Sequence, residues 1–278
     1  MNTTYSGNQT SLLVLTCTDS YPGNFIILSV TVFQILVLLP IHTWVLWLGT
    51  SDIRKGGNLA TSDIFTANLS LLELMSILLF LSTLVAFALN FQHTLLLTMF
   101  FSGSYMVGRP FTNCLICVER YIAVAHPVIY RSPATVKHRY IGAGLVWLLT
   151  LSYGGFIILT FPDPPVAAYL VSLSVNLLVI TACSLGVLKI LLKPNPGETQ
   201  KEGKYHQKKR AFVIITSILV SISVAYGMDM LIYSMKKYVN YDAFCVMMGS
   251  NMWLIQGIGL IQPFLYLSKL GKFSCIKG

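Results

Sequence analysis

The sequence predicts an all-α membrane protein with the architecture of a seven-transmembrane helix bundle. Of its 278 residues, 55% are hydrophobic and only 10% are charged, whereas soluble domains usually carry about 25% charged residues. Seven apolar runs follow one another along the chain, and each is long enough for the roughly 20 residues that a helix needs to cross a bilayer. These observations divide the chain into an N-terminal segment at 1–23, a membrane domain at 24–267 and a tail at 268–278.

The apolar runs are separated by residues that end helices or prefer water. We place the runs at 24–48, 59–89, 94–125, 140–161, 166–192, 210–235 and 243–267. His126-Pro127 ends the third run, because proline cannot continue an α-helix. The sequence Pro162-Asp163-Pro164-Pro165 separates the fourth run from the fifth. Polar or charged segments separate the remaining runs.

Positive charge is distributed unequally between the two sides of this arrangement. Fourteen lysines and arginines follow the first, third, fifth and seventh runs, whereas only Lys236 and Lys237 fall in loops on the opposite side. Loops rich in lysine and arginine stay in the cytosol. We therefore expect a multi-pass protein of the plasma membrane with its N-terminus outside and its C-terminus inside. The net charge of +9 is then explained by topology and by the lipid bilayer as partner, not by nucleic acid.

Four modification sites are candidates on this topology. Asn2 and Asn8 begin glycosylation sequons in the predicted extracellular segment. Cys17 and Cys245 both fall on the outer side, where a disulfide persists, and we expect them to pair. The alternative is two unpaired or intermolecular thiols. Cys275, beyond the last run, is either a palmitoylation site or an ordinary cytosolic thiol.

Several short motifs occur on the runs in a fixed order. The second run contains Asn68-Leu69-Ser70-Leu71-Leu72-Glu73, and the third ends in Glu119-Arg120-Tyr121 followed by Ile-Ala-Val-Ala-His-Pro. The fourth run contains Trp147, and the seventh ends in Gln262-Pro263-Phe264-Leu265-Tyr266. Together they resemble the NLxxxD, (D/E)RY, fourth-span tryptophan and NPxxY motifs of the rhodopsin-like (class A) G-protein-coupled receptors. The resemblance covers essentially the whole chain.

The resemblance implies a signalling mechanism. An extracellular ligand would favour an arrangement in which the inner ends of the fifth and sixth spans part from Arg120, and a heterotrimeric G protein would bind there. Glu119 would hold Arg120 in the resting state, and Tyr266 would rearrange beside it. We expect no enzyme activity, cofactor or metal site, because the few acids and histidines do not cluster in the sequence.

The family's ligand cavity implies further candidate residues. Its lining positions align here with Ser102, Met106, Tyr233, Met252 and Gln256. Simple packing is the alternative for each. Ser102 stands where the family's amine receptors have aspartate, and Gln256 stands where opsins have the lysine that binds retinal. The outer Lys236 and Lys237 favour an anionic ligand.

Charged residues in the middle of the membrane are the most informative departure from ordinary spans. Glu73 lies halfway along the second run, and Arg109 lies about three helical turns before Arg120. The matching positions in the family line a sodium pocket. We hypothesise that Glu73 and Arg109 form an ion pair here; the alternative is that Arg109 snorkels or meets backbone carbonyls. Asp229, in the outer half of the sixth run, is a candidate ligand contact or a structural hydrogen-bond acceptor.

Other departures leave two alternative functions open. Ala225-Tyr226-Gly227 replaces the family's Trp-x-Pro in the sixth span, and Asn176 and Ser184 align with its fifth-span proline and tyrosine. A receptor-like protein that no longer signals is therefore one alternative. The other is a transporter or channel that uses Glu73 and Arg109 as a polar relay. The apolar sequence between Asn113 and Glu119 argues against a continuous polar path.

Overall fold

The structure, a computed structural model, describes residue 17 and residues 20–54, 63–89, 92–130, 132–160, 166–192 and 202–269. Helices account for almost all of these ranges. The first long helix consists of α2 (Tyr21–Phe33), a π-helical turn (Gln34–Leu38) and α3 (Leu39–Arg54). The others are α4 (Asp63–Leu89), α5 (Gln92–Ala125), the short α6 (Pro127–Tyr130), α7 (Pro133–Leu159), α8 (Val166–Leu192), α9 (Glu202–Met235) and α10 (Tyr241–Lys269).

Within the described residues, six helical stretches are long and apolar enough to cross a membrane. They are Tyr21–Ser51, Ile64–Val85, Lys137–Leu159, Val166–Leu192, Thr216–Met235 and Tyr241–Phe264. Large apolar side chains point outward from these helices, among them Trp47 and Leu178 at 63% and 70% exposure. A water-soluble protein rarely exposes so many apolar groups, so the outward faces suit lipid. The chain has the architecture of a multi-pass helical membrane protein.

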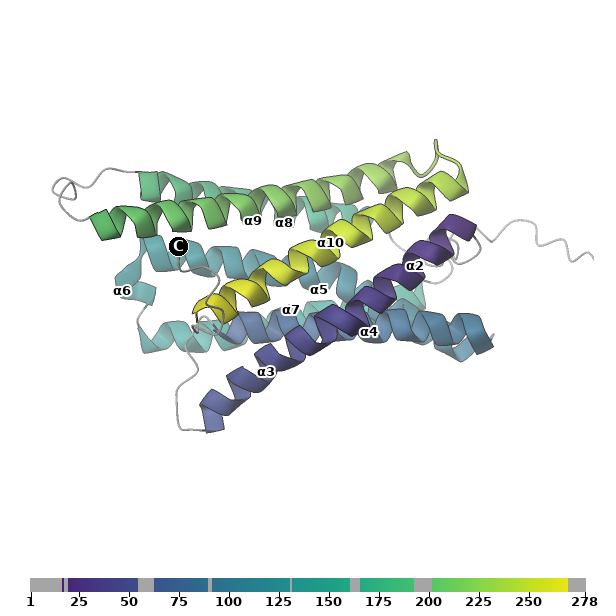
Figure 1. Ribbon diagram of the computed structural model, residues 1–278, viewed down its shortest axis with the longest axis horizontal. Helices are drawn as coiled ribbons and strands as arrows, with labels where there is room; N and C mark the ends of the chain where they lie inside the picture. Colours follow the sequence, from purple (N-terminus) through teal and green to yellow (C-terminus); the bar gives the residue numbers. More distant parts are fainter. Residues whose placement is uncertain are drawn as a thin grey trace, which may run out of the picture.

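The 34-residue helix α5 is not one of the six stretches, and its sequence contains Arg109, Glu119 and Arg120. It nevertheless lies inside the bundle, where it packs against α4, α7 and α8. In Figure 1, α8 and α9 run together along one side, α4 and α7 lie on the other, and α10 and α2–α3 cross in front of α5. This central position buries Arg109 and Glu119.

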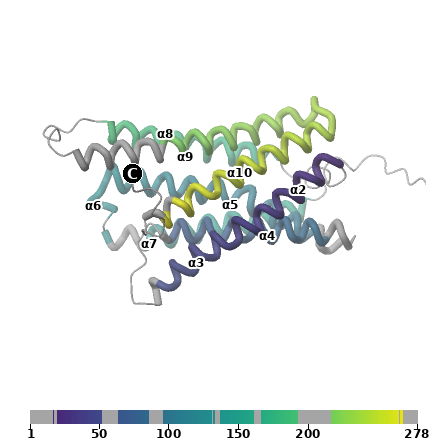
Figure 2. Tube along the Cα trace, in the orientation of Figure 1, coloured from purple at the N-terminus to yellow at the C-terminus, as the bar shows by residue number. Residues whose placement is uncertain are grey.

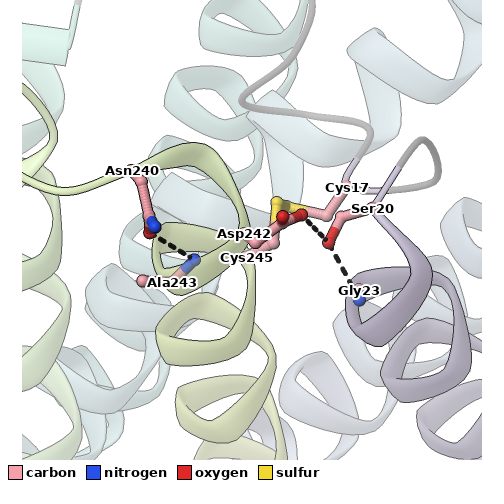
Figure 3. The surroundings of a disulfide bond; sticks show 7 residues. All are labelled: Cys17, Ser20, Gly23, Asn240, Asp242, Ala243 and Cys245. Atoms are coloured by element: carbon pink, nitrogen blue, oxygen red, sulfur yellow. Dashed lines mark hydrogen bonds between the residues drawn. A yellow bond between two sulfur atoms is a disulfide. The ribbon is translucent and has the colours of Figure 1, made fainter.

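The helices alternate in direction, so that their ends lie at two opposite ends of the bundle. Figure 2 shows the starts of α2 and α10 beside the end of α9 at one end, and α6 with the end of α8 at the other. We call these the disulfide end and the α6 end. The disulfide end takes its name from the bond between Cys17 and Cys245, which joins the segment before α2 to the first turn of α10 (Figure 3).

Polar side chains beside the disulfide hold the start of α2 against α10. The hydroxyl of Ser20 caps α2 by accepting from the Gly23 N–H at 3.5 Å, and it donates to Asp242 Oδ1 at 2.6 Å (Figure 3). The expected pairing of Cys17 with Cys245 is therefore present in the structure. The glycosylation candidates Asn2 and Asn8 and the palmitoylation candidate Cys275 lie outside the described residues.

The predicted apolar runs match the helices more closely at some ends than at others. The fifth run, 166–192, coincides with α8. By contrast, α7 begins at Pro133 and α9 at Glu202, both well before the runs predicted from 140 and 210. The physical reason is that hydrophobicity marks only the part of a helix that meets lipid. Backbone hydrogen bonding continues each helix into polar sequence.

Candidate functional site

A cavity of about 120 Å³ lies toward the disulfide end, between α4, α5, α8, α9 and α10. Its wall at the disulfide end is formed by Ile27, Phe80 and Met248, which pack with the disulfide-bonded cysteines. We call it the larger cavity, because a smaller one lies near Arg120. All six predicted ligand-contact residues line the larger cavity, namely Ser102, Met106, Asp229, Tyr233, Met252 and Gln256. The structure thus brings residues from three spans together at one site, while their contact with a ligand stays a prediction.

Glu73 and Arg109 form an ion pair at the floor of the larger cavity. The Nε atom of Arg109 lies 3.0 Å from Glu73 Oε1, and the two side chains are 5% and 0% exposed. The other two guanidinium nitrogens also have partners, because Nη1 donates to Tyr105 Oη at 2.6 Å and Nη2 donates to the Ile255 carbonyl oxygen at 2.8 Å. Gly259 of α10 packs directly against the pair, at a place where a side chain would meet Arg109.

Tyr105 completes this pair and was not predicted. Its hydroxyl accepts from Arg109 and donates to Glu73 Oε2 at 3.2 Å, so one phenol bridges both charges. Tyr105 precedes Arg109 by one helical turn, and residues four apart share a helix face. This four-residue spacing in the sequence could have indicated the contact between Tyr105 and Arg109. The carbonyl of Ile255 could not have been found in the same way, since it depends on how α10 packs against α5.

Asp229 accepts two hydrogen bonds beside the larger cavity. Tyr169 Oη donates to its Oδ2 at 3.1 Å, and the Nδ2 atom of Asn251 donates to its Oδ1. The same Nδ2 donates to the Ala225 carbonyl oxygen at 3.3 Å, which can only accept and so fixes the orientation of the amide. Asp229 is 9% exposed and lines the cavity. The expected structural hydrogen bonds of Asp229 are therefore present, and its contact with a ligand stays a prediction.

Three polar side chains connect the larger cavity with the other half of the bundle. Asn113 Nδ2 donates to Tyr226 Oη at 2.9 Å, and Gln262 Nε2 donates to Asn113 Oδ1 at 3.0 Å. We call this set the Asn113 bridge; it joins α9, α5 and α10. The sequence of α5 between Asn113 and Glu119 is apolar, as expected. The other polar groups of the bridge, Tyr226 and Gln262, come from neighbouring helices.

A smaller cavity of about 20 Å³ lies beyond the Asn113 bridge, toward the α6 end. Its lining includes Arg120, Gln262 and Ser184, together with apolar side chains of α5, α8 and α9. Gln262 therefore belongs both to the bridge and to the surroundings of Arg120. Tyr121 packs against Gly186 of α8. Among the residues of the predicted switch, Arg120 and Gln262 share this cavity.

The remaining switch residues of α10 lie close by. Pro263 lies inside α10 directly after Gln262 and is buried. Tyr266, which we expected beside Arg120, packs with Val45 and Leu48 of α3. Motif residues of α4 and α7 also meet, because Trp147 Nε1 donates to Asn68 Oδ1 at 2.7 Å. Each motif therefore contributes to contacts between helices.

Glu119 forms an ion pair that sequence reasoning missed. Its Oε1 atom lies 3.3 Å from Arg139 Nε of α7 and accepts from Tyr130 Oη of α6 at 3.4 Å. The Arg139 guanidinium also stacks 4.3 Å from the centre of the Tyr130 ring. From sequence, Arg139 was counted only as cytosolic charge. The role expected for Glu119, holding Arg120, stays a prediction, with Arg139 now present as a competing cation.

No family model matches the chain, and no curated protein matches it. The likeness to rhodopsin-like receptors therefore rests on the motifs and on their order along the sequence.

Proposed function

We propose that the chain is a rhodopsin-like G-protein-coupled receptor of the plasma membrane, in which α5 is the third of seven spans. The observation that carries this proposal is the Asn113 bridge. It connects a cavity lined by the candidate ligand residues to the surroundings of Arg120 through Tyr226 and Gln262. A signal that begins in the larger cavity would reach the predicted G-protein site through these side chains.

The burial of charge supports a membrane position for α5. A charged side chain facing lipid costs several kcal/mol, so a span with Arg109 and Glu119 needs partners inside the bundle. Glu73 and Arg139 are those partners. The positive loops identified in the sequence would lie at the α6 end, and the disulfide would lie outside the cell, where it persists.

The mechanism follows as a shift between two populations of the receptor. Tyr226 lines the larger cavity and also bonds to Asn113. A ligand that moves Tyr226 would weaken its bond to Asn113 and release α9 from α5. The inner end of α9 would then part from Arg120, and a G protein would bind the opened surface. Ligand and G protein each favour the same state, so each strengthens binding of the other.

A G-protein activation assay tests the proposal. The full chain is expressed in cells with a panel of Gα subunits, and basal and ligand-driven dissociation of the G protein is measured. Arg120→Ala should abolish both signals. Lys189→Gln, which changes an exposed cation in the last turn of α8, should leave them unchanged. Absence of any response across the panel, with the wild-type chain at the cell surface, would instead favour a receptor-like protein that does not signal.

The Asn113 bridge also supplies polar groups in the interior, which a transporter or channel would need along its path. That alternative predicts a flux of ions or small solutes across vesicles that contain the purified chain. The smaller cavity is about 20 Å³, close to the space of a single water molecule. We therefore expect no flux, and a flux that Asn113→Leu abolishes would replace the receptor proposal.

A further inference from the structure

The larger cavity contains one negative charge that no cation balances. Among the described residues that line it, Arg109 and Asp229 are charged. Arg109 is neutralised by Glu73, and its three nitrogens already have partners. No ion pair reaches Asp229 within the described part of the chain. Its two hydrogen-bond donors, Tyr169 and Asn251, are both neutral.

We take Asp229 as an ionised carboxylate that accepts from both donors. Such a group offers about four lone-pair positions, and the two hydrogen bonds leave some of them for a ligand. Two neutral hydrogen bonds do not replace the hydration that a buried carboxylate loses. A cationic group in the cavity would balance the charge and complete the acceptor's hydrogen bonds.

A second acceptor at the same cavity has no partner. Gln256 is 1% exposed and lines the cavity. Its Oε1 atom is buried and has no hydrogen-bond partner among the described residues. An unsatisfied buried acceptor costs free energy, and the expected explanation is a donor that the protein itself does not supply. The lining therefore has one acceptor without a donor, in addition to the negative charge of Asp229.

The apolar part of the cavity is aromatic in a way that suits a cation. Four tyrosines contribute to its wall, namely Tyr105, Tyr169, Tyr226 and Tyr233. Tyr169 and Tyr233 stack edge to face at 5.4 Å next to the carboxylate. Aromatic rings attract cations through the negative potential of their faces, and the attraction increases when water is excluded.

We infer that the ligand of this cavity is a small molecule with an ammonium group, which pairs with Asp229 and donates to Gln256. An ammonium has three donors and one positive charge, which would satisfy Gln256 Oε1 and balance Asp229. Ser102 lacks the carboxylate that amine receptors have at that place, and α9 provides it from another direction. Lys236 and Lys237, on which the expectation of an anionic ligand rested, do not line the cavity.

This inference rests on the proposed receptor function, because it names the class of ligand that the receptor binds. It is tested by binding alone, which needs no G protein. The full chain is purified in nanodiscs, and its thermal unfolding is followed with cyclohexylamine or isoamylamine hydrochloride. The alcohols of the same skeletons, cyclohexanecarboxylate, and sodium chloride at equal concentration serve as comparison compounds. The amines should raise Tm in a saturable manner, and none of the comparison compounds should do so.

Three variants assign the binding to the carboxylate. Asp229→Asn keeps the shape of the side chain and should weaken amine binding by about 30-fold or more, since removing one partner of a buried charge pair costs that much. Gln256→Leu leaves Asp229 intact and should weaken it several-fold. Asp242→Asn changes an exposed acid at the disulfide end, bonded to Ser20, and should have no effect.

The inference is overturned by any of four results. Amines could fail to stabilise the wild-type chain at millimolar concentration, or carboxylates could stabilise it instead. Sodium could give the same Tm shift as the amines, which would indicate an inorganic cation site. Finally, Asp229→Asn could fold and bind amines as the wild type does. Amine binding without any G-protein response would retain this inference and reject the proposed function.

Discussion

Arg109 Nε lies 3.0 Å from Glu73 Oε1 in the interior of the bundle, and Tyr105 bridges the two charges through its hydroxyl. A buried ion pair is weak support for stability by itself, because both charges have lost their hydration. Its consequence is instead a strong coupling between α4 and α5. Neither residue can be neutralised alone without leaving the other charged and buried.

We therefore predict that Glu73→Gln and Arg109→Gln are each more harmful than the two together. Each single change should destabilise the fold by about 3–5 kcal/mol and reduce surface expression. The double variant should recover much of both losses. Thermal unfolding and surface labelling measure the effect. The matched control combines Arg109→Gln with Glu119→Gln, an acid whose partner is Arg139, and should show no rescue. Additive losses in the Glu73 and Arg109 double variant would falsify the coupling.

The disulfide should stabilise the disulfide end as a single unit. We predict that Cys17→Ser, Cys245→Ser and the double variant lower stability equally, by about 2–5 kcal/mol, because each removes the same bond. Thermal unfolding measures the loss, and mass spectrometry without reductant detects the bond. Cys183→Ser, at a free and half-buried cysteine of α8, is the control and should have little effect. A double variant that is clearly worse than either single variant would point to different partners.

Adjacent glycines of α7 offer a direct comparison of packing. A Cβ atom at Gly154 would lie 2.7 Å from the Phe100 carbonyl oxygen of α5, whereas one at Gly155 would have no neighbour within 4 Å. Backbone cannot move aside as a flexible side chain does. Gly154→Ala should therefore destabilise the chain by about 1–3 kcal/mol, and Gly155→Ala should be neutral or slightly stabilising. Equal unfolding temperatures for the two variants would show that α5 and α7 do not pack so closely.

The long helices and several site residues could be predicted from the sequence because they depend on local pattern. Apolar runs mark lipid-facing lengths, and the fixed rise of a helix places Arg109 at the depth of Glu73. The resemblance to rhodopsin-like receptors supplied five of the predicted cavity residues, and Asp229 was chosen because it is an acid within a span. Neither step needs knowledge of individual contacts.

Apart from the Glu73–Arg109 pair, the side-chain contacts that connect spans were not predicted from the sequence. Asn113 and Gln262 are 149 positions apart, and their meeting depends on the rotation of α5 and α10 about their axes. Rotation results from the packing of many side chains, including close approaches at Gly154 and Gly259. The partner of Glu119 was missed for the same reason. No pattern within the third run indicates that Arg139 of α7 turns toward it.

The Glu119–Arg139 ion pair predicts a low basal activity when Arg139 is removed. Under the proposed function Glu119 holds Arg120 in the resting state, and Arg139, which pairs with Glu119 in the structure, would compete for the same carboxylate. Without Arg139, Glu119 has Arg120 as the adjacent cation, and the resting state should be favoured. Arg139→Gln should therefore lower basal G-protein activation at equal surface expression, and Glu119→Gln should raise it. Lys137→Gln, two residues away and exposed, is the control. A rise in basal signalling in Arg139→Gln would show that the ion pair itself maintains the resting state.

The Asn113 bridge predicts an effect of changing Tyr226, the residue of the bridge that lines the larger cavity. Tyr226→Phe removes the hydroxyl that accepts from Asn113 and keeps the aromatic ring that lines the larger cavity. A neutral hydrogen bond contributes about 1 kcal/mol, so the resting state should lose roughly five-fold in its population relative to the active state. Basal G-protein activation should rise accordingly, with amine binding retained. Tyr233→Phe, on the same helix and also lining the cavity, lies outside the bridge and is the control. Unchanged basal activity in Tyr226→Phe, at equal surface expression, would show that the bridge does not hold α9 in the resting position.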